Sequence, residues 1–229
     1  IRVSSVTGVQ TCALPIYEFN GQVALICEVL DALNIPHLSL DGYEADDIIA
    51  TLSRQADEHG WENIIVTGDR DSFQLVDDNT TVLYPVRGVS ELARMTPEAI
   101  EAKYGVGPQR YPELAALVGE TSDNLPGVPG VGVKTAAKWL ASFSGLENLL
   151  ARADQVPGKA GASFREHIED VRRNRHLNRL VNDLTLDLGL TDLELHGWDR
   201  TAVHQLFDAL EFRVLRERLL EAFPDDDNV

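Results

Sequence analysis

The chain has 229 residues, of which 44% are hydrophobic and 25% charged, and its formal net charge is −17 at pH 7. This composition is typical of a globular protein with one large domain or two small ones. No apolar run approaches the roughly 20 residues that cross a bilayer, so no spanning helix and no membrane partner is expected. The negative charge argues against a broad basic footprint, and any contacts with phosphate should therefore be few and local.

Residues 1–16 stand apart from the rest of the chain. Residues 6–16, VTGVQTCALPI, read like the in-frame translation of a sequencing-adapter oligonucleotide, so residues 1–16 are excluded from fold prediction. Cys12 falls in this segment, which leaves Cys27 as the single native cysteine and rules out an internal disulfide. A reducing, cytoplasmic compartment is the prediction that follows.

Residues 17–90 are predicted to form an α/β unit. The expected elements are helices over 23–33 and 48–56, a short helix at 71–76, and strands at 37–40, 62–67 and 80–86. The strand at 62–67 should be buried, because three β-branched residues follow one another in it. Strands and helices alternate along the chain, which predicts a parallel sheet.

Carboxylates follow two of these strands at the point where each strand ends. They are Asp41, Glu44, Asp46 and Asp47 after the first strand, and Asp69 and Asp71 after the second. The carboxyl ends of parallel strands meet at one rim, so both clusters should lie together there and repel one another unless cations bind. Oxygen ligands without nearby His or Cys favour Mg²⁺ or Mn²⁺ in a two-metal phosphodiesterase. Alternatively, these acids simply cap helices.

The stretch GETSDNLPGVPGVGVKTAAKWL, from Gly119 to Leu140, combines a carboxylate pair with a glycine-rich loop. In chain order it contains Glu120, Asp123, Gly127, Gly130, Gly132 and a helix start near Lys134. Closely spaced glycines let the backbone approach a bulky anion, and amides at a helix N-terminus point toward it. The carboxylates would repel phosphate without an intervening divalent cation, so the stretch predicts metal-dependent phosphodiester chemistry. An ordinary tight connection between two helices is the alternative.

After Val86 the pattern is wholly helical apart from one predicted edge strand at 184–190. Thr96 and Pro97 mark a helix start, a second helix is expected over 108–118, and a closing amphipathic helix over 201–222. Arginines recur in the segment 164–180, namely Arg165, Arg172, Arg173, Arg175 and Arg179. They form either a solvated helix face or a contact with a duplex backbone.

Three acidic motifs occur in the order GYEADD, TGDRD and GETSD, ahead of the glycine loop and its Lys134-Thr135 helix start. Together they resemble the 5′ nuclease, or flap endonuclease, family, in the form of the 5′-to-3′ exonuclease domain of bacterial DNA polymerase I. The resemblance covers Tyr17 to about Pro224. It implies a parallel-sheet α/β core, PIN-like or resolvase-like, over 17–90, a helical helix-three-turn-helix subdomain over 91–222, and an acidic linker from 223.

The same resemblance implies the ligands of two Mg²⁺ or Mn²⁺ ions. Those of the first ion are Glu44, Asp46 and Asp47, and those of the second are Asp69, Asp71, Glu120 and Asp123, the first five acids being catalytic. The third motif more usually begins with Asp, where this chain has Glu120. The implied DNA-binding residues are Gly127, Val128, Gly130, Val131, Gly132, Lys134, Thr135 and Lys138, with K⁺ held by loop carbonyls.

The activity that the resemblance implies is cleavage of DNA at or near a 5′ end or flap, in replication and repair, with a polymerase portion expected to follow. Further metal-binding and arch elements would precede Tyr17. We therefore expect an incomplete first metal site, uncovered apolar surface on the sheet, and weak or absent activity of this polypeptide. A non-catalytic module that binds DNA structures stays open, as does a metal-dependent phosphatase, although a phosphatase gives no reason for the glycine loop.

Overall fold

A computed structural model describes residues 16–88 and 90–223, with side chains from Gly21 onward, so the interpretation of residues 1–15 lies outside the described residues. The chain forms two compact units. The larger is Ser39–Leu190, and the smaller combines the chain up to Leu38 with the chain from Thr191. The predicted domain boundary near residue 90 lies inside the larger unit, whose hydrophobic core is continuous across it. A functional division at that point stays a prediction.

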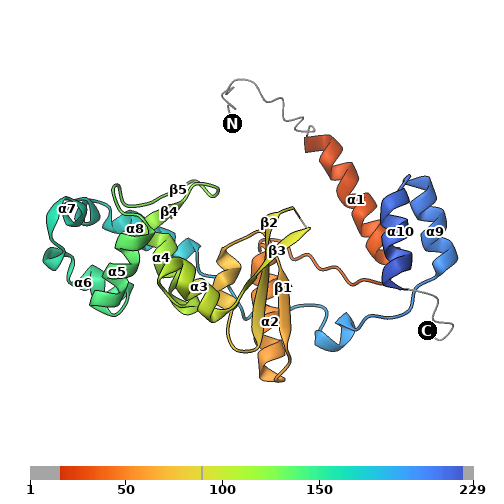
Figure 1. The fold of residues 1–229 in the computed structure, drawn as a ribbon, viewed down its shortest axis with the longest axis horizontal. Coiled ribbons are helices and arrows are strands. Elements are labelled where there is room, and N and C mark those ends of the chain that lie inside the picture. Colours follow the sequence, from red (N-terminus) through yellow and green to blue (C-terminus); the bar gives the residue numbers. More distant parts are fainter. Residues whose placement is uncertain (1–15, 89, 224–229) are drawn as a thin grey trace. The chain divides into compact units, whose positions relative to one another are not determined.

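The sheet of the larger unit has three strands in the order β1 (Asn63–Val66), β2 (Thr80–Arg87) and β3 (Glu91–Met95) (Figure 1). β1 and β2 are parallel, as predicted, but β3 runs antiparallel to β2. The prediction that the chain is wholly helical after Val86 is therefore wrong. Gly88 has a φ of 57°, a left-handed conformation that glycine adopts without strain, and it allows the chain to turn back along β2.

Two predicted strands do not form. Residues 35–40 and 181–187 have no regular secondary structure, and neither segment pairs with a described strand. In the second segment, side chains of the neighbouring helix take the backbone donors instead. Val181 N donates to Asp47 Oδ1 at 2.8 Å, and Leu184 N donates to Thr51 Oγ1 at 3.3 Å.

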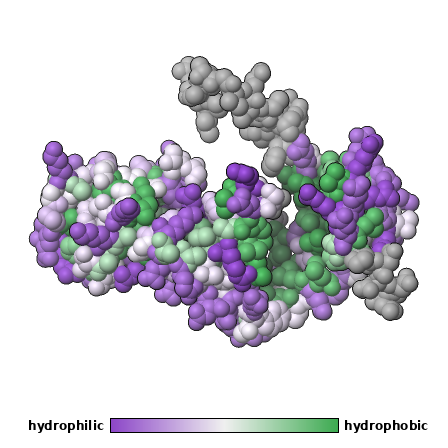
Figure 2. Space-filling model, in the orientation of Figure 1, coloured by the Kyte–Doolittle hydropathy of each residue, from purple (hydrophilic) through white to green (hydrophobic). Residues whose placement is uncertain are grey.

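β1 lies at the edge of the sheet and is buried on one face only. Ile65 is 5% exposed, whereas Ile64 and Val66 are 50% and 61% exposed, so the prediction of a fully buried strand is wrong. Figure 2 shows hydrophobic surface over this part of the sheet. The exposed pair agrees with the expectation that part of the sheet is uncovered.

The rest of the larger unit consists of helices and a second, two-stranded antiparallel sheet, β4–β5, and packs around one core. Its further elements are α2 (Ala45–Glu58), η1 (Asp71–Leu75), α3 (Pro97–Tyr104), η2 (Pro108–Arg110), α4 (Tyr111–Val118), β4 (Gly119–Glu120), β5 (Leu125–Pro126), α5 (Val133–Phe143), α6 (Leu146–Ala151), η3 (Ala153–Gln155), α7 (Gly158–Glu166) and α8 (Ile168–Leu177). Thr96 caps α3 through a bond from Ala99 N to Thr96 Oγ1 at 3.3 Å, and Pro97 starts this helix, as predicted. The α4 helix contacts both α5 and α8 and forms the centre of the unit.

The smaller unit contains α1 (Ile16–Ala32), α9 (Arg200–Ala209) and α10 (Arg213–Ala222), and η4 (Leu190–Leu193) precedes α9 in the chain. The predicted closing helix is broken in two, because Glu211 takes a left-handed φ of 57°. Phe212 then packs against Phe207, with ring centroids 5.8 Å apart, which stabilises the turn between α9 and α10. Among the described helices, none is long and apolar enough to cross a membrane.

Candidate functional site

A pocket of about 490 Å³ opens in the larger unit between the segment after β1 and the turn after α4. Its lining includes three acidic residues, namely Asp69, Glu120 and Asp123. It also includes three tyrosines, namely Tyr84, Tyr104 and Tyr111. The acids come from two motifs that are about 50 residues apart in the sequence and that the fold brings to one place.

Asp71, at the first position of η1, is the most strongly perturbed acid of this site. The pKa of its carboxyl is raised to about 8, first by burial and then, in decreasing order, by the nearby charges of Glu120, Asp69, Asp123 and Asp46. These charges act on one carboxyl because the β1 end, the α2 start and the α4–β4 turn lie together. The structure thus gathers five of the seven predicted metal ligands.

Two carboxylate oxygens in this cluster are buried without a hydrogen-bond donor among the described residues: Asp71 Oδ1 and Glu120 Oε2. Burial also raises the pKa of Glu120, with the charges of Asp123 and Asp69 as further causes and Arg70 acting in the opposite direction. A buried carboxylate oxygen with no partner is costly, and a divalent cation would satisfy it. Because both atoms are hard oxygen ligands, the residues present fit a cation of the Mg²⁺ type.

The cluster does not enclose a cation by itself. Over residues 16–88 and 90–223, no three His, Cys, Asp or Glu side chains form a ready-made metal cage. Water or substrate oxygens would have to complete the coordination, which is usual for Mg²⁺ bound by a few carboxylates together with phosphate.

The first acidic motif divides into two parts. Asp46 faces the cluster: its Oδ1 accepts a hydrogen bond from Ser72 Oγ at 2.9 Å. Burial raises the pKa of Asp46, the Ser72 bond lowers it, and the charges of Asp69 and Asp47 raise it further. This residue therefore joins the second motif directly.

Glu44 and Asp47 instead act at the start of α2. Glu44 is the N-cap residue, and its backbone N donates to Asp47 Oδ2 at 3.3 Å. The other Asp47 oxygen, Oδ1, accepts the Val181 N bond described above. The capping interpretation accounts for these contacts, and a metal-ligand role of Glu44 and Asp47 stays a prediction. Asp41 is exposed in the turn before α2.

The glycine loop is held against α4 at very short range. Val128 N donates to Leu117 O at 2.9 Å, and a Cβ placed on Gly127 would lie 1.9 Å from Val118 O. Only glycine fits at position 127, which shows why this loop can follow the acidic turn so closely. Val128 and Val131 are buried, so these two predicted DNA-binding residues could reach a ligand only through their backbone.

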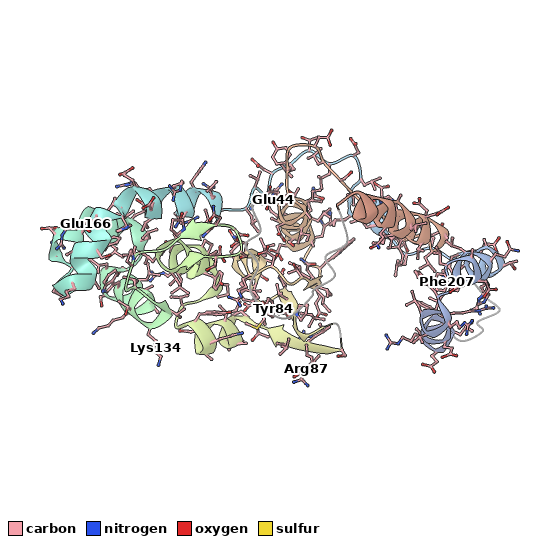
Figure 3. All side chains as sticks on the ribbon, turned by 90° about the horizontal axis from the view of Figure 1, so that it is seen from above. Glu44, Tyr84, Arg87, Lys134, Glu166 and Phe207 are labelled. Atoms are coloured by element: carbon pink, nitrogen blue, oxygen red, sulfur yellow. The ribbon has the colours of Figure 1, made fainter. Side chains whose placement is uncertain are left out.

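The α5 helix begins at Val133, directly after the loop, as the sequence indicated. The carbonyl of Gly132 accepts bonds from Thr135 N and Ala136 N, both at 3.0 Å. Lys134 and Lys138 are exposed one turn apart on this helix, and Figure 3 shows Lys134 at the outer surface. The loop and Lys134 therefore lie at the N-terminal end of α5, and Lys138 follows in its second turn.

The sequence did not single out Asn174, whose side chain bonds to the backbone next to the glycine loop. This side chain is fully buried on α8, and its Nδ2 donates to Pro126 O at 2.8 Å and Ala116 O at 3.3 Å. Ser163 Oγ adds a bond to Pro129 O at 3.0 Å. One feature of the sequence could have indicated that Asn174 is buried: it follows Val171 by three residues, on the same face of an otherwise charged helix.

The arginines around α8 have local partners. Arg172 and Arg173 form exposed ion pairs with Glu169 and Asp170 at 3.7 and 3.0 Å. Arg165 Nη1 donates to two backbone carbonyls, at 3.0 Å each, near the end of η3. These contacts favour the solvated-face interpretation for Arg172 and Arg173 and give Arg165 a structural role.

Gln74 is a second residue that the sequence did not single out. Its Nε2 donates to Asp71 O and to Asn178 O, both at 2.9 Å, and its Oε1 accepts from Leu180 N at 3.4 Å. The side chain thereby ties the acidic segment η1 to the chain that leaves α8. Asn174 on α8 and Asn178 directly after it therefore connect this part of the chain to Pro126, next to the glycine loop, and through Gln74 to the backbone of Asp71.

The fold thus combines an α/β sheet, a helical unit and a cluster of carboxylates next to a glycine-rich loop. Two family models match in succession: the 5′-3′ exonuclease N-terminal resolvase-like domain over residues 15–105, and the 5′-3′ exonuclease C-terminal SAM fold over residues 106–201. The chain belongs to the 5′-3′ exonuclease family, which confirms the resemblance carried by its three acidic motifs.

Among its relatives are bacterial DNA polymerases I. The chain is 54% identical over 205 residues to DNA polymerase I of Mycobacterium leprae, a match that covers 90% of the chain and 22% of the relative. It is 42% identical over 208 residues to the thermostable DNA polymerase I of Thermus thermophilus, covering 90% and 24% respectively. The chain thus spans less than a quarter of the length of these relatives.

Solved structures with the same fold include two nucleases. One is the flap endonuclease of bacteriophage T5 in a complex with DNA and metal ions, with a TM-score of 0.60, 19% identity, and coverage of 85% of this chain and 67% of that one. The other is the catalytic core of Rad2 with a DNA substrate, with a TM-score of 0.57, 16% identity, and coverage of 94% and 73%. At these identities the likeness establishes the fold alone.

Proposed function

We propose that this chain is the 5′-3′ exonuclease portion of a DNA polymerase I and hydrolyses phosphodiesters at or near the 5′ end of a DNA duplex or flap. The observation that carries the proposal is the pair of buried, donor-less carboxylate oxygens, Asp71 Oδ1 and Glu120 Oε2, beside a loop suited to phosphate. Carboxylates placed next to a phosphate grip make chemical sense when a cation lies between them. Family membership supports the same reaction.

We propose divalent Mg²⁺ or Mn²⁺ as the cofactor. The acids gathered around Asp71 would hold it: Asp46, Asp69, Asp71, Glu120 and Asp123. Glu44 and Asp47 are proposed to join the first of two ions by giving up their capping contacts. When bound, such ions supply Lewis acidity to the phosphoryl oxygens and to the attacking water.

The chain's own groups position the DNA. Loop amides between Gly127 and Gly132, with Lys134 and Lys138, are proposed to hold one strand of the duplex through its phosphates. K⁺ is proposed to bind loop carbonyls. Asp123 precedes Gly127 by only four residues, so a strand held by the loop lies within a few nucleotides of the carboxylates. In this proposal, catalysis depends on the positioning of the DNA and on electrostatic stabilisation of the transition state, with no covalent intermediate.

The partners that follow are DNA and, in the full-length protein, a polymerase portion. Polymerase sequences make up the relatives that the chain matches over about a fifth of their length. A cytoplasmic compartment is proposed as well, since Cys27, the only cysteine within the described residues, is unpaired.

The test is cleavage of a labelled 5′-flap duplex in Mg²⁺ and in Mn²⁺, with binding measured in parallel by gel shift. Asp71→Asn and Glu120→Gln should abolish the weak cleavage expected of this polypeptide while leaving the gel shift. Glu166→Gln is the matched control, because Glu166 is exposed on α7 and, in Figure 3, lies well away from Tyr84, which lines the pocket. Cleavage that persists in both site variants would exclude the carboxylate cluster as the catalytic centre.

A non-catalytic DNA-binding module is the second candidate, favoured by the incomplete cage among the described carboxylates. Binding without cleavage, by a parent chain that is folded, would support it. Neither binding nor cleavage would overturn the nucleic-acid function altogether.

A further inference from the structure

Arg70 is the only basic residue among those lining the acidic pocket. It stands between Asp69 and Asp71 in the sequence, yet among the described residues its guanidinium forms no ion pair with a carboxylate. Instead Arg70 Nε donates to Tyr84 Oη at 3.3 Å. The side chain is therefore held through one nitrogen by a neutral partner.

Tyr84 holds this arrangement in place. Its ring packs on the fully buried Phe73, with centroids 5.5 Å apart, and Lys103 Nζ lies 5.7 Å from the Tyr84 centroid and 5.4 Å from that of Tyr104. A ring fixed between a core phenylalanine and an ammonium group has little freedom to turn. Its hydroxyl is consequently a fixed anchor for Arg70 in a pocket that is lined by both tyrosines and acids.

The guanidinium also shares the wall of this pocket with the carboxylates of Asp69, Glu120 and Asp123. Arginine carries five N–H donors in a planar fork that matches phosphate oxygens two at a time. With Nε on Tyr84, the terminal nitrogens are left for a ligand.

We propose that Arg70, positioned by Tyr84, binds the phosphate at the cleaved 5′ end of the DNA. The inference rests on the proposed function and deepens it. In that reaction the water oxygen forms a bond to phosphorus, the P–O3′ bond breaks, and the 3′ oxygen takes up a proton. The phosphate stays on the 5′ end of the remaining strand.

That terminal phosphate carries more charge than an internal one and needs donors that carboxylates cannot supply. Arg70 is the one side chain on the pocket wall with a cationic donor, and a space of about 490 Å³ accommodates a nucleotide-sized group. The competing role for Arg70 is structural, a counter-charge that only offsets repulsion among the acids. The two roles differ in whether the 5′ phosphate itself is recognised.

The experiment compares two duplexes with a recessed 5′ end, identical except that one carries a 5′ phosphate and the other a 5′ hydroxyl. Binding is measured by fluorescence anisotropy in Ca²⁺, which takes oxygen ligands as Mg²⁺ does, and the strands are recovered intact on a gel. The parent chain should bind the phosphorylated duplex about tenfold more tightly than the hydroxyl duplex, because one additional charge-assisted hydrogen bond contributes about this much to the affinity.

Arg70→Ala should remove this preference, Arg70→Lys should restore part of it, and Tyr84→Phe should reduce it because the anchor is lost. Arg87→Ala should keep it in full: Arg87 is exposed at the end of β2, and Figure 3 shows it at the margin of the unit, away from Tyr84. Thermal unfolding checks that each variant is folded.

Three outcomes would overturn the inference. If Arg70→Ala keeps the preference and weakens both duplexes equally, Arg70 is a counter-charge. If the parent binds both duplexes equally, the 5′ phosphate is not recognised, and the proposed function still stands. If a folded parent chain binds neither duplex, the inference and the proposed function both fail.

Discussion

The raised pKa of Asp71 predicts how the stability of the metal-free protein depends on pH. The carboxyl titrates near 3.8 when unfolded and at about 8 when folded, so between these values the folded state holds a proton that the unfolded state has lost. Stability contributed by this group must therefore fall as pH rises from about 4 to about 8 and level off above that. Asp71→Asn removes the titration with little change of shape.

The size of the effect follows from the shift. A change from 3.8 to about 8 corresponds to a ceiling of about 6 kcal/mol at ~1.4 kcal/mol per pH unit. Asp71 is only partly buried and shares its protons with neighbouring acids, so solvent screening reduces this. We expect the free energy of unfolding of Asp71→Asn, relative to the parent, to increase by about 1–2 kcal/mol between pH 6 and pH 8.

The assay is urea denaturation followed by circular dichroism at pH 6, 7 and 8, in EDTA and again in Mg²⁺. Cation binding favours the charged carboxyl, so Mg²⁺ should stabilise the parent most at pH 8 and Asp71→Asn much less. Glu166→Gln serves as the control for removal of an exposed carboxyl. Parallel pH profiles of the parent and Asp71→Asn in EDTA would refute the reasoning, because they would mean that no proton is taken up at Asp71 on folding.

Three further changes test the loop and its supports. Gly127→Ala places a Cβ 1.9 Å from Val118 O and should lower the free energy of unfolding by roughly 2–4 kcal/mol. Gly130→Ala meets open space but has a left-handed φ of 80°, so it should lower the free energy of unfolding by only about 1 kcal/mol. Urea denaturation of the two variants compares these losses. Asn174→Ala removes the hydrogen bonds to Ala116 O and Pro126 O, so it should lower the free energy of unfolding by about 1–3 kcal/mol and weaken duplex binding in a gel shift. Gln74→Met removes the hydrogen bond to the backbone of Asp71 in η1, so it should lower kcat for a flap duplex more than it raises KM. A larger change in KM than in kcat would contradict this positioning role of Gln74.

Much of the fold could be predicted because it depends on local pattern. The α1 and α2 helices follow from apolar residues at helical spacing, and the start of α3 follows from Thr96 and Pro97. The predicted strands at 37–40 and 184–190 failed for a different reason. A strand is stable only with a neighbour, and the sequence of a segment does not say whether a neighbour will be present.

The same limit applies to the turns that redirect the chain. Apolar periodicity continues from Thr201 to Ala222, but the left-handed Glu211 divides the segment into α9 and α10 so that Phe212 can pack on Phe207. The antiparallel β3 strand was missed because its residues alternate weakly and only pairing with β2 makes them a strand. In each case tertiary packing overrode local preference.

The sequence by itself determined the chemistry of the site: which acids are present, their order in three motifs, and the glycine spacing next to them. Only the tertiary structure decided that Asp71 and Glu120 are buried together, that Asp47 serves a cap, and that Arg70 meets Tyr84. The physical reason is that the chemical type of a metal ligand and the conformational freedom of a glycine are properties of single residues, so the sequence alone gives them. Burial, pKa and hydrogen-bond partners depend on groups that are far apart in the chain and come together only when it folds.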